Sequence, residues 1–404
     1  MIKYTNLMSI RNLIPHNIVN TFYHLPKAFL AVLYYRYPAK DLTVIGITGT
    51  DGKTTTSTVI YEILRQAGKK TALITSVSAK IGGKELSTGL HVTSPDPWEL
   101  QKLLRYISDK GFNYVVLEST SHGLAQHRLL GCNFKIGAVT NITHEHLDYH
   151  GTWKKYLKDK ARLFKKAKFA VLNKDDLSFK ILKKNITSKI ITYGMKKADF
   201  TLKNFPFKTK MPGKYNQYNC LAAIAVTKLL NISDADIRKA IAKFKGVIGR
   251  MDVVYDKSFK VIIDFAHTPN ALKQVLIACK EMPSKRLISV FGCAGLRDSR
   301  KRLLMGEISC RLADVSIFTA EDPRTENIND IFRQMESGCK NKKNLYKEPD
   351  RKKAIKLAIS MAKKGDIIGI FGKGHEKSMC YGTVEHPWSD HKAVKEILKK
   401  HPSS

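Results

Sequence analysis

The clearest chemistry in this chain is predicted by GITGTDGKTTT, which spans residues 46–56 and follows an apolar run. Gly49 and Gly52 would let backbone N–H groups approach phosphate oxygens where a helix begins. Lys53 would neutralise the β- and γ-phosphates, and Thr54 would offer its hydroxyl to magnesium. An isoleucine stands where the general P-loop pattern has its first glycine. The segment therefore predicts an ATP or GTP site of a variant kind.

Two further polar segments follow predicted strands. ESTSHGLAQHRL begins with Glu118, at the carboxyl end of an apolar run. THEHLDYH holds three histidines and two carboxylates within residues 144–150, with a spacing that matches no common zinc site and without cysteine partners. Its oxygen-rich neighbours favour magnesium that bridges to phosphate. A basic helical segment, YLKDKARLF, then carries Lys160, which composition alone would class as one solvated lysine among many.

These side chains need a parallel sheet to position them. Short β-branched runs alternate with amphipathic segments such as STVIYEILRQAG, which predicts parallel strands joined by helices. The predicted strands of the first sheet are residues 42–48, 70–76, 113–119, 135–142 and 168–173. A second set comprises residues 260–266, 286–292, 315–320 and 366–372. Each strand ends in glycine or polar residues, where open α/β sheets bind ligands.

We therefore predict an α/β protein with two large domains. A central ATP-binding domain with a mostly parallel sheet is expected over residues 41–248, and a Rossmann-like α/β domain over residues 249–404. Residues 1–40 are expected to form a linker or remnant, in which the apolar run at residues 28–35 docks on the central domain. That run is too short to span a bilayer, so weak contact with a membrane surface is the lesser alternative.

Composition narrows the class of protein further. The net charge of +35 suits an anionic partner, although lysines scattered over solvated faces explain it as well. No nucleic-acid-binding module is recognisable, so we expect no nucleic-acid partner. Seven cysteines, an odd number without a CxxC pair, argue against a disulfide framework and a structural zinc site, and favour a reducing cytoplasm.

From about residue 40 to the C-terminus, the ordered motifs resemble those of the Mur ligases. The motifs are GTDGKTTT, ESTSH, NITHEHLDYHG, KARLF, NQYN, GRMD, DFAHTPNAL, FGCAGLRD, EDPR and GKGHE. The variant P-loop is itself a feature of that family, which reads GTxGKT. The resemblance implies a ligase that uses ATP and Mg²⁺ to convert a carboxylate into an acyl phosphate, which an amine then attacks.

The resemblance also assigns roles to single residues. The catalytic residues would be Lys53, Glu118, His146 and Lys160. The metal ligands would be Thr54, Glu118, His146 and Lys160, with the lysine carbamylated by carbon dioxide. Contacts with ATP would come from Gly49, Thr50, Asp51, Gly52, Lys53, Thr54, Thr55, Asn216, Asn219, Arg250 and Asp264. Because Arg250 belongs to the second predicted domain, its approach to phosphate would require domain closure.

The implied substrates are a UDP-muramoyl dipeptide and a diamino acid. The residues implied to bind them are Thr93, Ser94, Thr120, Gln126, Arg128, Arg297, Asp322, Arg324, Gly372 and Glu376. Arg324 would grip the distal carboxylate of meso-diaminopimelate. Asp322 departs from the asparagine of diaminopimelate-adding relatives, and its added charge would favour an ammonium there. Diaminopimelate is thus the first choice, and lysine or another diamino acid is the alternative.

Other functions stay open at this point. The domain that holds the uridine diphosphate in relatives is not recognisable before the P-loop, so the chain could act on another carboxylate, as folylpolyglutamate synthetases do. A non-catalytic ATP-binding derivative is a third possibility, against which the intact motif residues argue. We expect a cytoplasmic monomer.

Overall fold

The computed structural model describes residues 16–86, 94–143 and 147–400. The chain divides into two compact units. Unit 1 comprises residues 1–142, 152–208 and 218–243, and unit 2 comprises residues 143–151, 209–217 and 244–404.

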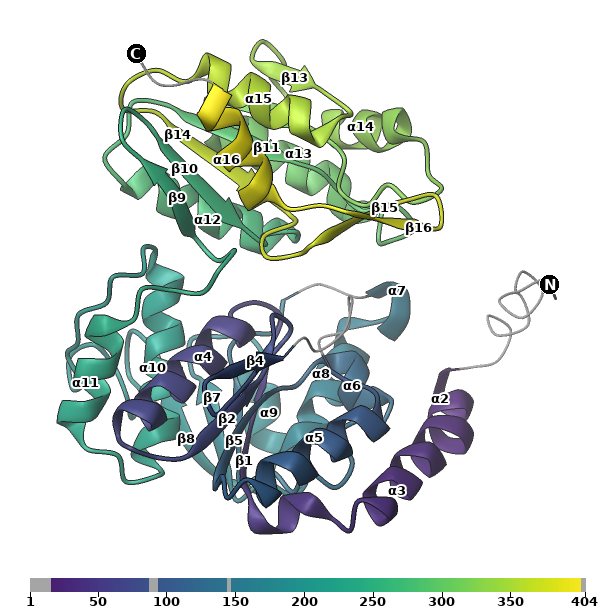
Figure 1. The fold of residues 1–404 in the computed structure, drawn as a ribbon, viewed down its shortest axis with the longest axis vertical. Helices are drawn as coiled ribbons and strands as arrows, with labels where there is room; N and C mark the ends of the chain where they lie inside the picture. Colours follow the sequence, from purple (N-terminus) through teal and green to yellow (C-terminus); the bar gives the residue numbers. More distant parts are fainter. Residues whose placement is uncertain (1–15, 87–93, 144–146, 401–404) are drawn as a thin grey trace. The chain divides into compact units, whose positions relative to one another are not determined.

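Unit 1 is built on an eight-stranded sheet in the order β4-β3-β2-β5-β1-β6-β7-β8 (Figure 1). Its strands are β1 (Thr43–Thr48), β2 (Thr71–Ile74), β3 (Ala79–Ile81), β4 (Lys84–Leu86), β5 (Tyr114–Glu118), β6 (Ile136–Val139), β7 (Phe169–Asn173) and β8 (Lys189–Tyr193). The parallel core from β2 to β8 contains all five strands predicted from sequence. At the other edge of the described sheet, β3 pairs antiparallel with β2, and β4 pairs antiparallel with β3.

The helices of unit 1 include α4, which begins directly after the P-loop. They are α2 (His16–Val19), η1 (Asn20–His24), α3 (Leu25–Tyr34), η2 (Pro38–Asp41), α4 (Lys53–Gln66), α5 (Pro97–Asp109), α6 (Ser121–Ala125), α8 (Trp153–Ala161), η3 (Arg162–Phe164), α9 (Phe179–Asn185) and α11 (Asp234–Lys243). Helix α10 (Lys214–Lys228) contains the boundary between the units, and α7 (Leu147–His150) is assigned to unit 2.

Unit 2 has a six-stranded sheet in the order β13-β12-β11-β14-β10-β9, parallel except for β9, and a separate hairpin of β15 and β16. Its strands are β9 (Asp252–Asp256), β10 (Lys260–Asp264), β11 (Leu287–Phe291), β12 (Val315–Phe318), β13 (Leu345–Lys347), β14 (Ile367–Phe371), β15 (Ser378–Tyr381) and β16 (Val384–Pro387). Its other helices are α12 (Pro269–Glu281), α13 (Arg300–Leu312), α14 (Ile328–Glu336), α15 (Arg351–Met361) and α16 (Asp390–Lys400). The predicted fold class is confirmed for both sheets.

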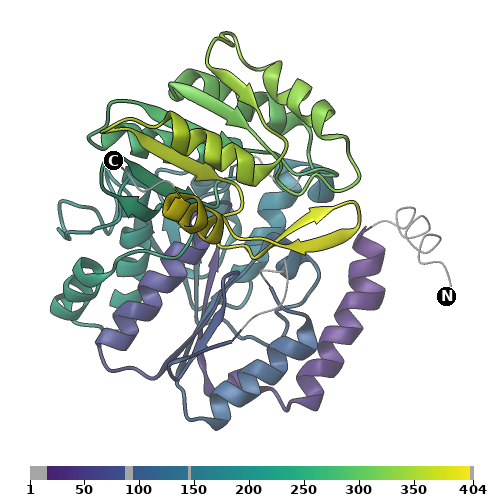
Figure 2. The same cartoon turned by 45° about the horizontal axis from the view of Figure 1, so that its top comes forward.

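The apolar segment before the P-loop packs on unit 1, as predicted. Helix α3 lies beside α5 (Figures 1 and 2) and buries Ala28, Ala31 and Val32. Lys27 forms an ion pair with Asp96, with Nζ and Oδ2 2.6 Å apart. None of the helices in the described residues combines the length and apolar character needed to cross a bilayer.

One feature was not anticipated from the cysteine pattern. A disulfide joins Cys310 in α13 to Cys339, which follows α14. The two helices pack together, which brings the two Cα atoms within 5.6 Å. The other five cysteines are buried thiols outside this disulfide.

Candidate active site

The P-loop is braced by the residues that follow strand β6. The Thr50 N–H donates to the carbonyl of Asn141 at 2.8 Å, and the Asp51 N–H donates to the Asn141 side chain at 3.0 Å. Thr140 Oγ1 donates to the carbonyl of Asp51 at 2.6 Å. The loop is therefore held in shape by the protein itself before any phosphate binds.

Close packing explains both glycines of the loop. Gly49 has φ +147°, and a Cβ there would lie 1.8 Å from Thr140 Oγ1. Gly52 has φ +81°, and its Cβ would lie 2.3 Å from Asn219 Oδ1, which also accepts from Thr56 Oγ1 at 3.2 Å. Any larger residue would displace these neighbours. Helix α4 begins at the next residue, so the N–H groups of its first turn can face an anion.

Three oxygen-bearing side chains meet beside the start of α4. Thr54 Oγ1 donates to Glu118 Oε2 at 2.9 Å, and the Ser76 N–H donates to the same oxygen at 3.1 Å. The hydroxyls of Thr54 and Ser76 lie 3.2 Å apart. Hydroxyl and carboxylate oxygens are ligands that Mg²⁺ prefers, so this set fits the predicted magnesium site.

Lys160 converges on the same loop from helix α8. Its side chain is 2% exposed, and its Nζ donates to the carbonyl of Gly49. The Nζ also lies 4.5 Å from the centroid of the Tyr156 ring, and the Tyr156 hydroxyl lies 3.1 Å from Thr50 Oγ1. A lysine that sequence alone would place in solvent is therefore buried against the P-loop. Lys53 Nζ donates to the carbonyl of Thr50 at 2.7 Å.

Two predicted site residues, His146 and Thr93, lie outside the described residues. Within the described part of the chain, no cluster of three or more histidine, cysteine, aspartate or glutamate side chains could hold a metal. The oxygens of Thr54, Glu118 and Ser76 are therefore the donors on which the predicted magnesium site depends here.

A second polar group in unit 1 joins the residues predicted to bind the acceptor. Thr120 caps α6 by accepting from the Gly123 N–H at 3.0 Å. Its hydroxyl lies 2.8 Å from Ser94 Oγ, and Arg128 donates to the Ser94 carbonyl at 3.0 Å. Gln126 follows at the C-terminal end of α6. These four predicted residues thus surround one short helix.

The predicted nucleotide contacts of unit 2 lie at the carboxyl end of β10. The Asp264 carboxylate accepts from the N–H groups of Met251 at 2.7 Å and Ala266 at 2.8 Å. The Arg250 guanidinium lies 4.5 Å from the centroid of the Phe265 ring. Asp264 thereby fixes the backbone beside Arg250. In α10, Asn216 donates to the carbonyl of Pro212 at 2.6 Å.

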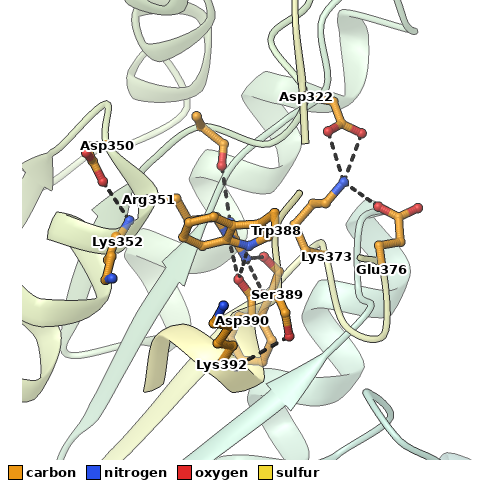
Figure 3. A network of polar contacts seen from close by, with 12 residues as sticks. Asp322, Asp350, Arg351, Lys352, Lys373, Glu376, Trp388, Ser389, Asp390 and Lys392 are labelled. Carbon is orange, nitrogen blue, oxygen red and sulfur yellow. Dashed lines mark hydrogen bonds and ion pairs between the residues drawn. The ribbon is translucent and has the colours of Figure 1, made fainter. Parts of the chain in front are cut away.

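The charge of Asp322 is paired inside the protein, and its effect on the choice of amino acid stays a prediction. Lys373 is fully buried and donates to both carboxylate oxygens of Asp322, at 2.9 and 3.0 Å (Figure 3). Lys373 also pairs with Glu376 (Figure 3). Burial opposes the charged form of Lys373, but Glu376 and Asp322 outweigh it and raise its pKa above the ordinary value.

The other residues predicted to select the amino acid differ in their exposure to solvent. Arg324 is partly exposed, and its guanidinium donates to the carbonyl of Gly295. Arg297 is exposed in the loop between β11 and α13. Gly372 has φ +106°, and a Cβ there would lie 2.4 Å from a Glu321 carboxylate oxygen.

Glu321 is a buried carboxyl at the ends of the unit 2 strands. Burial raises its pKa to about 7, against the opposing effect of cationic groups. Those groups are Lys301, His267, Arg351 and Lys373. Its Oε2 is buried without a hydrogen-bond partner among the described residues.

A buried ion pair fixes the backbone around that carboxyl. Arg351 and Asp390 are both fully buried, and two hydrogen bonds of 2.8 Å join them (Figure 3). Arg351 also donates to the carbonyls of Ala320 at 3.2 Å and Phe371 at 2.9 Å. It therefore ties together the ends of β12 and β14.

Sequence reasoning missed several partners of the predicted residues: Ser76, Thr140, Asn141, Tyr156, Lys373 and Arg351. Ser76 and Asn141 were detectable in principle, because both follow predicted strands at the ligand-binding edge of the sheet. Lys373 lies within the GKGHE motif, but nothing in the sequence shows that it pairs with Asp322.

Models of known families match both units. The model described as "Mur ligase middle domain" matches residues 47–227, and the one described as "Mur ligase, glutamate ligase domain" matches residues 249–374. These matches confirm the resemblance that the motifs indicated.

Individual relatives agree with the family models. The UDP-N-acetylmuramoyl-L-alanyl-D-glutamate–2,6-diaminopimelate ligase of Aquifex aeolicus is 40% identical over 385 residues, which cover 90% of this chain and 79% of the relative. A solved structure of a ligase of the same name is 32% identical, with a TM-score of 0.62 and the same two coverages. E. coli FolC with ADP shares the fold at 20% identity, with a TM-score of 0.71 over 99% of this chain and 98% of FolC.

Proposed function

The chain belongs to the Mur ligase family and is an ATP-dependent ligase, and we propose that it adds meso-diaminopimelate to UDP-N-acetylmuramoyl-L-alanyl-D-glutamate. The observation that carries this proposal is the convergence of Lys53, Thr54, Glu118 and Lys160 on one braced phosphate loop. The names of relatives at 36–40% identity supply the substrates.

The reaction must bring two anions together, the γ-phosphate of ATP and the acceptor carboxylate. Magnesium, when bound at the Thr54 and Glu118 oxygens, would screen their repulsion. Lys53 and the N–H groups at the start of α4 would hold the phosphates in line for attack by the carboxylate oxygen. ADP leaves, an acyl phosphate remains, and the amine then displaces inorganic phosphate to form the amide and release a proton.

We assign Lys160 the role of a carbamylated metal ligand. An ammonium repels a divalent cation, whereas an N-carboxylated lysine supplies anionic oxygens close to the P-loop. The position of Lys160 supports this assignment, because its side chain is buried and its Nζ reaches the P-loop. In this proposal Arg250 and Asp264 contact the phosphates and ribose of ATP, and Ser94, Thr120 and Arg128 hold the acceptor.

Pairing within unit 2 supports diaminopimelate over lysine as the added amino acid. Lys373 lies against Asp322 and shares its one positive charge between Asp322 and Glu376, so repulsion of a distal carboxylate is weaker than from an unpaired aspartate. Arg324 can then form a bidentate contact with that carboxylate, which lysine lacks.

The test is phosphate release from ATP by the purified chain with magnesium and bicarbonate. We expect release to require both UDP-N-acetylmuramoyl-L-alanyl-D-glutamate and meso-diaminopimelate, and L-lysine to substitute poorly. Phosphate release with L-lysine but not with meso-diaminopimelate would overturn the choice of amino acid. Binding of ATP without release under any combination would overturn the proposed acceptor.

A further inference from the structure

A row of exposed apolar side chains covers the outer side of the N-terminal helices. Helices α2, η1 and α3 follow one another without a break. The exposed residues are Ile18, Phe22, Tyr23, Phe29, Leu30, Leu33 and Tyr34, and Tyr37 just beyond the helix. Phe22 is 78% exposed and Tyr34 70%. Their spacings of three, four and seven residues place them on one face, which we call the N-terminal apolar face.

This face is not the side by which the helix packs on unit 1. The opposite side buries Ala28, Ala31 and Val32, and Arg105 of α5 donates to the carbonyl of Tyr35 at 2.7 Å. At the border between the two sides, the Tyr34 ring contacts Trp98 of α5, with centroids 5.4 Å apart, and Tyr34 is still 70% exposed. Unit 1 therefore holds the helix firmly while its apolar face points to solvent.

The charged residues of the N-terminal helices are basic. Residues 16–40 contain Lys27, Arg36 and Lys40 and no aspartate or glutamate, and Lys27 pairs with Asp96 of unit 1. Arg36 and Lys40 are exposed at the C-terminal end of the helix. The whole chain carries a net charge of +35, which favours its association with anionic surfaces.

We propose that the N-terminal apolar face docks on an anionic lipid bilayer, with the helix lying in the plane of the surface. Leucine and phenylalanine side chains would enter the boundary between headgroups and acyl chains, where tyrosine is also stable because its ring is apolar and its hydroxyl polar. Arg36 and Lys40 would face the anionic headgroups. Contiguous exposed apolar surface marks an interaction site, and exposed leucine, phenylalanine and tyrosine side chains beside Arg36 and Lys40 are the combination that binds an anionic lipid surface.

Vesicle binding by the full-length chain tests the proposal. Co-sedimentation would compare vesicles of phosphatidylcholine alone with vesicles containing about one-third phosphatidylglycerol. We expect the chain to bind the anionic vesicles, to bind neutral vesicles more weakly, and to dissociate as salt is raised. A double variant, Phe29→Ser with Leu33→Ser, should weaken binding about tenfold or more, because two partly inserted side chains are lost.

A matched control exists in α13 of unit 2. Leu303 and Leu304 are each 45% exposed, close to Phe29 at 48% and Leu33 at 45%. Leu303→Ser with Leu304→Ser removes similar apolar surface and should leave vesicle binding unchanged. If the double variant unfolds, the single variant Phe22→Ser tests the same face by the same vesicle-binding assay. The double variant Arg36→Gln with Lys40→Gln should weaken binding to anionic vesicles and leave binding to neutral vesicles unchanged.

Several results would overturn the proposal. One is failure of the wild-type chain to bind anionic vesicles at low salt. Another is equal loss of binding in the face variant and the α13 control. The third is that the wild-type chain binds no vesicles and forms a dimer, detected by light scattering, which Phe29→Ser with Leu33→Ser converts to a monomer. The face would then join two copies of the chain. ATP turnover of these variants in solution should match wild type, which separates this test from the proposed function.

Discussion

Burial of Lys160 against the phosphate loop gives the carbamate role a direct test. Lys160→Ala should abolish ATP turnover, and a short carboxylate such as acetate should restore part of it by occupying the vacated space. The expected loss is about a hundredfold or more, as for other groups that stabilise developing charge. Turnover is measured by phosphate release, with and without acetate.

The matched control is Lys158→Ala on the same helix, a lysine to which no catalytic role is assigned. It should leave turnover unchanged. Full activity of Lys160→Ala without acetate would contradict the carbamate role, and so would equal stimulation of wild type and variant by acetate.

Selection of the amino acid is predicted to depend on Arg324 rather than on the charge of Asp322. Arg324→Lys should lower kcat/KM for meso-diaminopimelate about 10- to 100-fold, because a bidentate charged contact is lost. Asp322→Asn should change the ratio of kcat/KM for diaminopimelate to that for lysine by less than about threefold, because the buried Lys373 already screens the charge of the aspartate. A large swing of that ratio toward diaminopimelate in Asp322→Asn would show that the aspartate charge reaches the ligand after all.

Glu321 should make stability depend on pH. The pKa of Glu321 is about 7 in the folded protein, above the 4.5 of an exposed glutamate. Between these two pH values the folded state therefore binds more protons than the unfolded state. The free energy of unfolding should therefore fall as pH rises from about 4.5 to about 8, by about 3 kcal/mol from this group. Glu321→Gln should lack this loss, as measured by urea denaturation at both pH values. Parallel pH profiles for the two proteins would contradict the assignment.

For single residues, the sequence motifs predicted which residue types form the candidate site but not which side chains they contact. Gly-Lys-Thr identified the phosphate loop because glycine, lysine and threonine each have a fixed task beside a phosphate. The sequence did not show that Lys373 pairs with Asp322, because 51 residues separate them and only the folded sheet brings them together. The catalytic and binding roles assigned to the site residues stay predictions.

Among the elements, the ends of β12 and β14 depend on the buried pair of Arg351 and Asp390. Asp390→Asn should lower the free energy of unfolding by about 3–5 kcal/mol, because it leaves a fully buried guanidinium without its anion. Asp350→Asn is the control: Asp350 caps α15, and asparagine caps a helix about as well. The measurement is urea denaturation. Equal effects of the two substitutions would mean that the buried pair contributes no more than the cap.

Which strands could be predicted depended on their burial. The central strands β1, β5, β6 and β14 are almost wholly buried, so their sequences are continuous apolar runs. By contrast, β4 and β16 are exposed along their whole lengths, and their sequences carry no such run. Pairing with a neighbour, rather than an apolar pattern, determines these short strands, so the sequence alone did not predict them.

At the scale of the whole molecule, the excess of positive charge should cost stability. A net charge of +35 makes the folded chain repel itself, and salt screens that repulsion. Raising sodium chloride from about 20 mM to about 300 mM should therefore raise Tm by a few degrees. The measurement is thermal unfolding followed by circular dichroism, with sodium fluoride as a control for ion-specific effects. A Tm that falls with both salts would show that local ion pairs dominate.

The fold alone does not determine the reaction. FolC shares the architecture over nearly the full length of both chains, at 20% identity. The distinction from such enzymes rests on the motifs and on relatives at 36–40% identity.

The pairing of Lys373 with Asp322 also constrains how this chain can evolve. With asparagine at position 322, loss of the Lys373 charge would remove the cation from one carboxylate, that of Glu376. With Asp322 in place, the same loss would remove the cation from two carboxylates, of which Asp322 is buried. Substitutions at positions 322 and 373 are therefore epistatic: Lys373 costs less to replace after Asp322 has changed to asparagine, and the opposite order passes through a less stable intermediate.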